Sequence, residues 1–319
     1  MHTMTQNILD TLQSGAVFAD LAPLGLIAFS GEDTATYLQG QLTNDVRKLA
    51  AGAAQYSGFC SPKGRLLASF LLWNKDGATY MQLAGELQEA IQKRLSMFIL
   101  RSRVKARDAR AEAVRIGVAG HRAAQLIEAT LGALPPTDMS VAHTRAGSVI
   151  RLAAERYQIV TPPESAATLN EALSHDASRI DYPAWQWLEI RAGIPTILPA
   201  TQEQFVPQMV NFDLTDSVNF QKGCYTGQEI VARTQYLGKL KRRMYLVHSD
   251  SPASPGDELY SADMEGQASG MIVNAQPAPN GGWDALAVIQ ISSADAHPIH
   301  LRSLDGARLA IEPLPYALA

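Results

Sequence analysis

The sequence predicts an α+β protein made of two α+β modules followed by a small β-barrel. Two modules are expected because strand-like apolar segments alternate with segments of helical periodicity as far as residue 240. A barrel is expected because the chain from Arg242 onward consists of short strand-like segments separated by turn residues. We therefore predict modules at residues 1–110 and 111–240 and a barrel at residues 241–319.

The first module begins with a helical pattern over residues 30–40, where the Ser30 hydroxyl can cap the first free amides. Two apolar segments, residues 65–73 and 78–84, follow as strands. Residues 74–77 between them end in Asp-Gly, which supplies the positive φ angles of a tight turn, so the pair is predicted to be a hairpin.

The remaining elements continue the alternation of strand and helix. Apolar residues at helical spacing predict a helix over 87–98, and a strand is expected over 101–108. The second module is predicted from two strand-then-helix pairs, at residues 114–120 with 121–132 and at residues 156–161 with 166–173.

Composition excludes several classes of protein. The 319 residues are 46% hydrophobic, enough for a sizeable core, and the net charge of -4 gives no general attraction to polyanions. No apolar run approaches the roughly 20 residues that cross a bilayer, and the first residues lack the pattern of a signal peptide. We therefore expect a cytoplasmic protein with no membrane partner.

Cysteine and histidine usage predicts no metal site. The only cysteines are Cys60 and Cys224, far apart in sequence, and a cytoplasmic location favours free thiols. No local set of four Cys and His ligands occurs, and His248, His297 and His300 show no helix-face spacing.

The most unusual segment is residues 219–229, where two glycines flank a thiol. Gly223 and Gly227 permit a tight backbone, and Lys222 lies two positions before Cys224. A nearby ammonium stabilises a thiolate, so Cys224 is a candidate for redox, nucleophilic or metal chemistry. The alternative is a small buried residue in a turn, and residue chemistry leaves both open. The segment lacks the spacing of a phosphate-binding loop.

At this segment the chain resembles a known family. The eight residues Lys222, Gly223, Cys224, Tyr225, Thr226, Gly227, Gln228 and Glu229 resemble the signature of YgfZ-type proteins. Weaker similarities occur in the family's order at residues 37–46, 60–64, 191–195 and 311–316. Together they cover nearly the whole chain.

The resemblance implies the fold of the glycine-cleavage T-protein, with modules around a central channel that binds tetrahydrofolate or a derivative. It implies that Cys224 lies at or near the channel mouth, as the functional thiol of a motif that includes Lys222. It also implies an accessory protein that supports iron–sulfur enzymes and thereby tRNA methylthiolation. The expected partners are folate and iron–sulfur enzymes or assembly proteins, with direct tRNA binding as a weaker expectation.

Four residues are carried over from the family as folate contacts. Trp185 matches the family's stacking Trp, with Trp187 as the near alternative, and ordinary core packing is the competing interpretation of both. Leu24 stands where an aromatic residue is expected, which replaces stacking by apolar contact. Arg191 stands where relatives commonly have Glu, which removes an acceptor for the pterin but adds a partner for the folate tail.

One departure bears on catalysis. The two aspartates that serve aminomethyl transfer in the T-protein are absent from the matching residues 64–69. Without a carboxylate at the folate nitrogen the reaction lacks its acid–base group. We therefore expect a non-enzymatic accessory protein and not a glycine-cleavage aminomethyltransferase.

Several alternatives remain open. A folate-dependent one-carbon transferase would use Cys224 as nucleophile and Glu229 as base on an amine or RNA substrate. A third interpretation is a scaffold with a vestigial channel. Cys60 would be a resolving partner for Cys224 if the fold brought the two thiols together.

A basic cluster near the end of the second module is a further candidate for binding. It is expected to meet a folate polyglutamate tail rather than RNA, because Tyr225 and Tyr236 are too few for a stacking platform. Its members are Arg233, Lys239, Lys241, Arg242 and Arg243.

Overall fold

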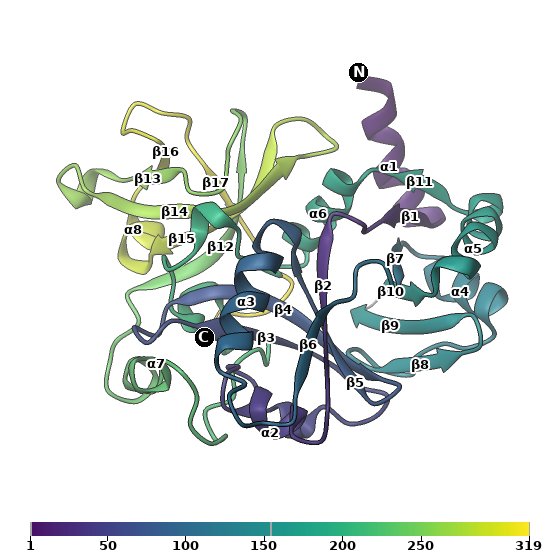
Figure 1. Ribbon diagram of the computed structural model, residues 1–319. Helices are drawn as coiled ribbons and strands as arrows, with labels where there is room; N and C mark the ends of the chain where they lie inside the picture. The colour runs from purple at the N-terminus through teal and green to yellow at the C-terminus, as the bar shows by residue number, and fades with distance from the viewer. Residues whose placement is uncertain (1, 154, 319) are drawn as a thin grey trace. The chain divides into compact units, whose positions relative to one another are not determined.

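A computed structural model describes residues 2–153 and 155–318 (Figure 1). These residues divide into two compact units. The first unit consists of residues 2–34, 47–55 and 71–185, and the second of residues 35–46, 56–70 and 186–318. The three-part division expected from the sequence stays a prediction. Among the described residues, no helix is both long enough and apolar enough to cross a membrane.

The chain alternates strands and helices up to α7 and then becomes mostly strands, so the predicted α+β class is confirmed. The α-helices are α1 His2–Ser14, α2 Thr34–Gln39, α3 Gln88–Met97, α4 Ala123–Leu131, α5 Pro163–Asp176, α6 Tyr182–Arg191, α7 Gln228–Tyr236 and α8 Ile291–Ala296. The strands up to β9 are β1 Val17–Asp20, β2 Leu24–Ser30, β3 Ala54–Cys60, β4 Leu66–Lys75, β5 Ala78–Ala84, β6 Lys105–Asp108, β7 Val114–Ala119, β8 Val141–Thr144 and β9 Gly147–Ala153. The later strands are β10 Arg156–Thr161, β11 Ser178–Ile180, β12 Arg242–Ser249, β13 Glu258–Tyr260, β14 Ala268–Pro277, β15 Trp283–Gln290, β16 His300–Leu301 and β17 Ala310–Glu312.

Five strands form a sheet in the order β3-β4-β5-β2-β6. The predicted hairpin is its β4–β5 pair, in which Lys75 faces Ala78 across a two-residue turn. Asp76 and Gly77 have φ angles of 49° and 75°, the backbone that a tight hairpin turn of this length requires. The Asp-Gly signal in the sequence therefore identified this turn correctly.

A six-stranded sheet of order β11-β1-β7-β10-β9-β8 lies in the first unit. Helices α4 and α5 lie side by side over one face of it (Figure 1). Ile116 and Val118 of β7 pack there against Ile127 of α4 and Leu173 of α5. Because strand side chains alternate, β7 turns Arg115 and Gly117 to the opposite face.

The last sheet has the order β16-β13-β14-β15-β12-β17 and lies in the second unit. The small β-barrel predicted for this region is confirmed only in part: the sheet curls but does not close, because its edge strands, β16 and β17, do not pair with each other in the described chain. These edges contain only two and three residues, too few to continue the ladder around. The result is a curled half-barrel around an apolar core that includes Leu259, Ile272 and Ile289.

Candidate functional site

The loop before α7 exposes the motif cysteine and buries the residues on either side of it. Gly223 and Cys224 are exposed, whereas Lys222 and Tyr225 are buried, each about 7% exposed. The loop ends at Gly227, which caps α7 with a φ angle of 81°. Cys224 therefore presents its thiol on a loop whose flanking residues are held inside the protein.

Lys222 holds this loop against the last residue of α2 and the segment that follows it. Its ammonium Nζ donates hydrogen bonds to the carbonyl oxygens of Gln39 at 2.7 Å and Asn44 at 3.0 Å, and to that of Leu42. It also lies 4.9 Å from the centroid of the Tyr225 ring, a cation–π contact. The ammonium is thus surrounded by acceptors from a segment distant in sequence. Lys222 is the residue that positions the loop.

The same segment also fixes the chain that leads into the motif. The Thr43 hydroxyl donates to the Ser217 carbonyl at 2.8 Å, and the amide of Asn219 donates to the Thr43 carbonyl at 3.0 Å. The Asn44 side chain donates to the Asp216 carbonyl at 2.5 Å. Thr43 and Asn44 therefore hold the chain before the motif in place by hydrogen bonds to its backbone.

Another loop approaches the backbone so closely at position 227 that only glycine fits there. Position 223 has no such neighbour. A Cβ on Gly227 would collide with the Ser61 carbonyl and lie 2.8 Å from the Gly64 Cα. A Cβ on Gly223 would meet nothing within 4 Å. The tight backbone predicted for both glycines is therefore confirmed at Gly227 only.

The two thiols are in opposite environments. Cys60, at the end of β3, is fully buried, and this burial raises its pKa to about 12. Cys224 is exposed, and both cysteines are free. Burial also raises the pKa of Tyr225, with a smaller contribution from the charge of Cys60. A neutral, enclosed Cys60 is poorly suited to exchange with the exposed thiol, because the thiolate is the attacking species.

Of the predicted folate contacts, Leu24 and Trp185 belong to the first unit, and both are buried. The indole of Trp185 covers Gly117 on β7, where a Cβ would come 2.5 Å from the ring. A glycine in this strand thus allows the large ring to approach the backbone. Trp185 therefore has a packing function in the first unit.

Trp187 and Arg191 belong to the second unit and share a partner there. The Trp187 indole N–H donates to Asp284 at 2.7 Å, and Arg191 lies 3.4 Å from the same carboxylate oxygen. Arg191 also pairs with Glu312. The other oxygen of Asp284 lies 2.7 Å from His248 Nδ1, its cross-strand neighbour. The sequence did not indicate this network, because its members come from separate strands and a helix.

Three members of this network, His248, Asp284 and Glu312, could place ligand atoms within 4.8 Å of one another. Their carboxylates already neutralise Arg191, and Asp284 accepts two further hydrogen bonds. A metal ion would have to compete with this guanidinium. The arrangement is therefore an ion-paired network of the second unit.

The first unit contains a second feature that the sequence did not indicate. Arg115 is only 2% exposed, and neither its Nε nor its Nη1 has a hydrogen-bond acceptor in the described chain. Burial lowers the pKa of Arg115, while the charges of Asp20 and, more weakly, Tyr182 oppose this shift. Asp20 and Tyr182 line an open cavity of about 590 Å³, together with Ala22, Pro23, Arg179, Ile180 and Asp181.

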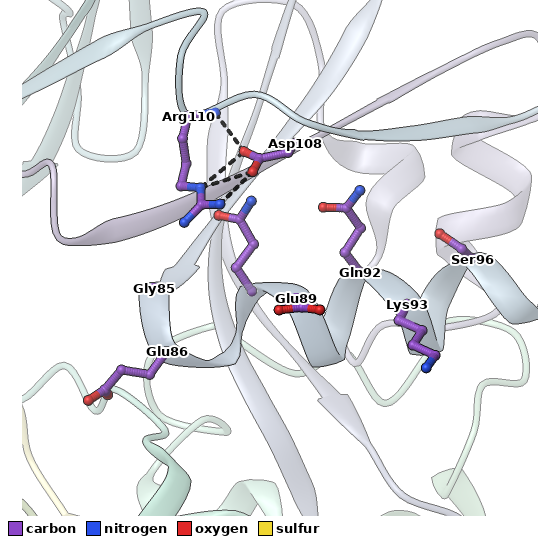
Figure 2. Close-up of a pocket in the computed structure, with 9 residues that line it drawn as sticks. Gly85, Glu86, Glu89, Gln92, Lys93, Ser96, Asp108 and Arg110 are labelled. Carbon is purple, nitrogen blue, oxygen red and sulfur yellow. Dashed lines mark hydrogen bonds and ion pairs between the residues drawn. The ribbon is translucent and has the colours of Figure 1, made fainter.

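Another cavity of the first unit, about 540 Å³, runs alongside α3 (Figure 2). Its wall is polar: Glu86 comes from the turn before α3 and Lys93 from α3 itself, and Arg110 pairs with Asp108 at 2.6 Å. The hydrogen bonds from Arg110 hold the pKa of Asp108 well below its usual range. This cavity is lined by none of the residues predicted to bind folate.

The basic cluster of the sequence is divided by the fold. Arg243 is buried and forms two hydrogen bonds with Asp213, at 2.6 and 2.8 Å. Arg242 is half-buried and donates to the Ala268 carbonyl at 3.2 Å. The other three cations, Arg233, Lys239 and Lys241, are exposed.

Comparison with known proteins places this geometry in a family. Residues 1–160 match the family described as GCVT N-terminal domain. The tRNA-modifying protein YgfZ of Sodalis glossinidius (strain morsitans) is 31% identical over 301 residues, covering 92% of this chain and 90% of the relative. The protein of the same name from Yersinia pseudotuberculosis serotype IB (strain PB1/+) is 32% identical over 300 residues, with the same coverage.

The fold has a close counterpart among solved structures. The glycine cleavage system aminomethyltransferase T of Bartonella henselae superposes with a TM-score of 0.80, over 98% of this chain and 89% of that one. At 17% identity this likeness shows a shared fold, as the sequence resemblance predicted. The chain therefore belongs to the YgfZ family and has the fold of the glycine-cleavage T-protein.

Proposed function

We propose that this protein is a folate-binding accessory protein that supports iron–sulfur enzymes and, through them, tRNA modification. Cys224 is its functional thiol, in a redox or cluster-maintenance role. Lys222 is its positioning residue. The curated relatives are named tRNA-modifying proteins, which supports a role in tRNA modification for this chain as well.

The observation that carries the proposal is the exposure of Cys224 on an anchored loop. A thiol that served packing would be buried, as free cysteines commonly are, and Cys60 is an example in the same unit. Cys224 is instead held toward solvent by three hydrogen bonds of Lys222 and by the burial of Tyr225. Such a thiol is accessible to a second molecule.

A folate ligand fits the polar groups of the first unit. The T-protein fold is one that uses folate. The cavity lined by Asp20 and Tyr182 adjoins Leu24 along the chain, and Tyr182 begins the helix that carries Trp185. The two unpartnered nitrogens of Arg115 would suit a ligand with carbonyl or carboxylate oxygens, because unpaired buried donors are costly. Folate carries both kinds of oxygen. When bound, it would supply a one-carbon carrier.

The residues at the T-protein's aspartate positions have structural tasks here. Ala68 is fully buried in β4, and the Ser69 hydroxyl accepts the amide of Ile197 at 3.0 Å. Neither is a carboxylate that could exchange protons with a folate nitrogen near neutral pH. This supports an accessory function over aminomethyl transfer.

The test of the thiol compares two single variants in a strain that lacks the protein. Cys224→Ala is expected to abolish support of iron–sulfur enzymes, measured as methylthiolated tRNA by mass spectrometry. Cys60→Ala, the matched control, is expected to retain it. Unchanged methylthiolation with Cys224→Ala would remove this residue from the proposal.

The test of the ligand is a titration of the purified protein with tetrahydrofolate and 5-formyltetrahydrofolate, followed by tryptophan fluorescence. Saturable quenching is expected, with weaker binding for Arg115→Met and Trp185→Phe. Trp73→Phe is the control, because Trp73 is buried in β4 and stacks on Tyr80 at 5.6 Å. Absence of saturable binding would contradict the folate part and leave the thiol part standing.

A further inference from the structure

An exposed surface begins directly after the motif, along α7 and the segment that joins it to β12. We call it the α7 surface and define it by five residues: Arg233, Tyr236, Leu237, Lys239 and Lys241. Gly227 of the motif caps the same helix. At 1.5 Å per residue, Tyr236 lies about 14 Å along the helix axis from this cap.

The α7 surface is positively charged, in a chain whose net charge is -4. Residues 233–243 include five cations and no Asp or Glu. The fold commits Arg243 to Asp213 and turns Arg242 to a carbonyl, so the exposed charge comes from Arg233, Lys239 and Lys241. A local excess of this kind attracts an anionic partner.

The same surface also exposes two large side chains. Tyr236 is 67% exposed and Leu237 is 84% exposed. The Tyr236 ring meets the edge of Phe220, with 6.3 Å between centroids and an angle of 72° between the planes. This contact orients the ring while leaving much of its surface free.

We infer that the α7 surface binds RNA, with phosphates on its cations and an unpaired base on the Tyr236 ring. This deepens the proposed function and rests on it, since tRNA is the molecule that function concerns. Phosphate backbones are neutralised by exposed Lys and Arg, and single-stranded bases stack on aromatic rings. Lysine, which makes up two of the three cations, is depleted in protein–protein interfaces. The chemistry therefore favours RNA over an acidic protein surface.

The sequence by itself favoured a folate polyglutamate tail for the basic cluster. The structure favours RNA over this tail for two reasons. Arg243 leaves the cluster because it pairs with Asp213, and Tyr236 adds an exposed ring among the remaining cations. A polyglutamate tail has carboxylates but no aromatic base that would use this ring.

The experiment measures binding of a purified, fluorescently labelled elongator tRNA by anisotropy at several salt concentrations. Lys239→Gln/Lys241→Gln is expected to flatten the slope of log affinity against log salt by about 1.5, since each phosphate contact contributes roughly 0.7 to 0.9. Lys93→Gln/Lys105→Gln, which alters two exposed lysines of the first unit, is the matched control and should keep the wild-type slope.

The aromatic contact is tested separately. Tyr236→Ala is expected to weaken tRNA binding about tenfold, as loss of one stacked base does, whereas Tyr236→Phe keeps the ring and the affinity. Equal effects of the two variants, or a wild-type salt slope in the double lysine variant, would overturn the inference.

A parallel titration with tetrahydrofolate pentaglutamate separates the other occupants. If the double lysine variant loses affinity for pentaglutamate but not for tRNA, the surface serves the folate tail and the RNA inference is wrong. If the wild type binds no tRNA, the inference fails even when the variants impair iron–sulfur support. The proposed function fails by a different result, unchanged methylthiolation with Cys224→Ala.

Discussion

Two loops of the second unit each combine a cysteine with a nearby lysine, and the fold treats them in opposite ways. In one loop Cys60 is buried and Lys63, three residues later, is exposed. In the other, Lys222 is buried and Cys224, two residues later, is exposed. The loops meet where Gly64 approaches Gly227. Sequence spacing is thus a poor guide to which member of a Cys–Lys pair is available for chemistry.

The difference follows from where each lysine finds hydrogen-bond acceptors. Buried ammonium groups are tolerated only when their donors are satisfied. Lys222 finds three carbonyls at the end of α2 and in the turn after it, so the loop can bury it and expose the thiol. Lys63 remains in water, and Cys60 is enclosed because it ends the buried strand β3.

The largest expected effect is on thiol reactivity. At pH 8, iodoacetamide should alkylate Cys224 at least about a thousandfold faster than Cys60, because Cys60 is enclosed and only about one part in ten thousand is thiolate. Mass spectrometry of the two peptides over time gives the ratio, and labelling in guanidinium is the control. Similar rates in the native protein would remove the contrast between the loops.

The next effect is on stability, through the two lysines. Lys222→Met should lower the free energy of unfolding by about 3 kcal/mol, because it leaves buried carbonyls without their donor. Lys63→Met, the matched substitution in the other loop, should change it by less than about 0.5 kcal/mol. Urea unfolding measures both. Equal losses would mean that Lys222 does not anchor the motif.

The two motif glycines sharpen the comparison further. Gly227→Ala should cost about 2 kcal/mol, because alanine disfavours a positive φ angle and its Cβ would meet the Cys60–Gly64 loop. Gly223→Ala should cost well under about 1 kcal/mol, since its Cβ would enter open space. Thermal unfolding of the pair tests this, and a larger loss at Gly223 would contradict the loop geometry.

The smallest effect is a dependence on alkaline pH. The folded protein holds the Cys60 proton up to a pKa of about 12, whereas the unfolded chain releases it near pH 9. The unfolded state therefore binds fewer protons in this window, and stability falls as pH rises. Relative to Cys60→Ala, the wild type should lose about 1 kcal/mol between pH 9 and pH 10. If the free energy of unfolding changed with pH in the same way for both proteins, Cys60 would not titrate in this way.

Local features of the sequence were predictable because their causes are local. The β4–β5 hairpin follows from Asp76 and Gly77, whose backbone preferences suit the turn whatever surrounds it. That the predicted barrel would stay open was not predictable, because closure depends on the lengths and pairing of strands distant in sequence, and β16 and β17 are too short to close it.

The two tryptophans of α6 also show what the sequence could not predict. On sequence grounds Trp185 matched the folate contact of the family, and Trp187 was the near alternative. Two residues apart on a helix, they point about 200° apart around its axis. Trp185 accordingly packs on Gly117 in the first unit, and Trp187 bonds to Asp284 in the second. The two side chains therefore cannot make the same contact with one ligand.

By itself, the sequence determined the α+β class, the family and the motif that contains Cys224, because these depend on residue order and on the backbone preferences of single residues. Only the tertiary structure decided that Cys224 faces solvent while Cys60 does not, and that Lys222 binds carbonyls. It also decided that Arg243 leaves the basic cluster while Tyr236 joins its surface. Burial and hydrogen-bond partners come from segments far apart in sequence, which only the folded chain brings together.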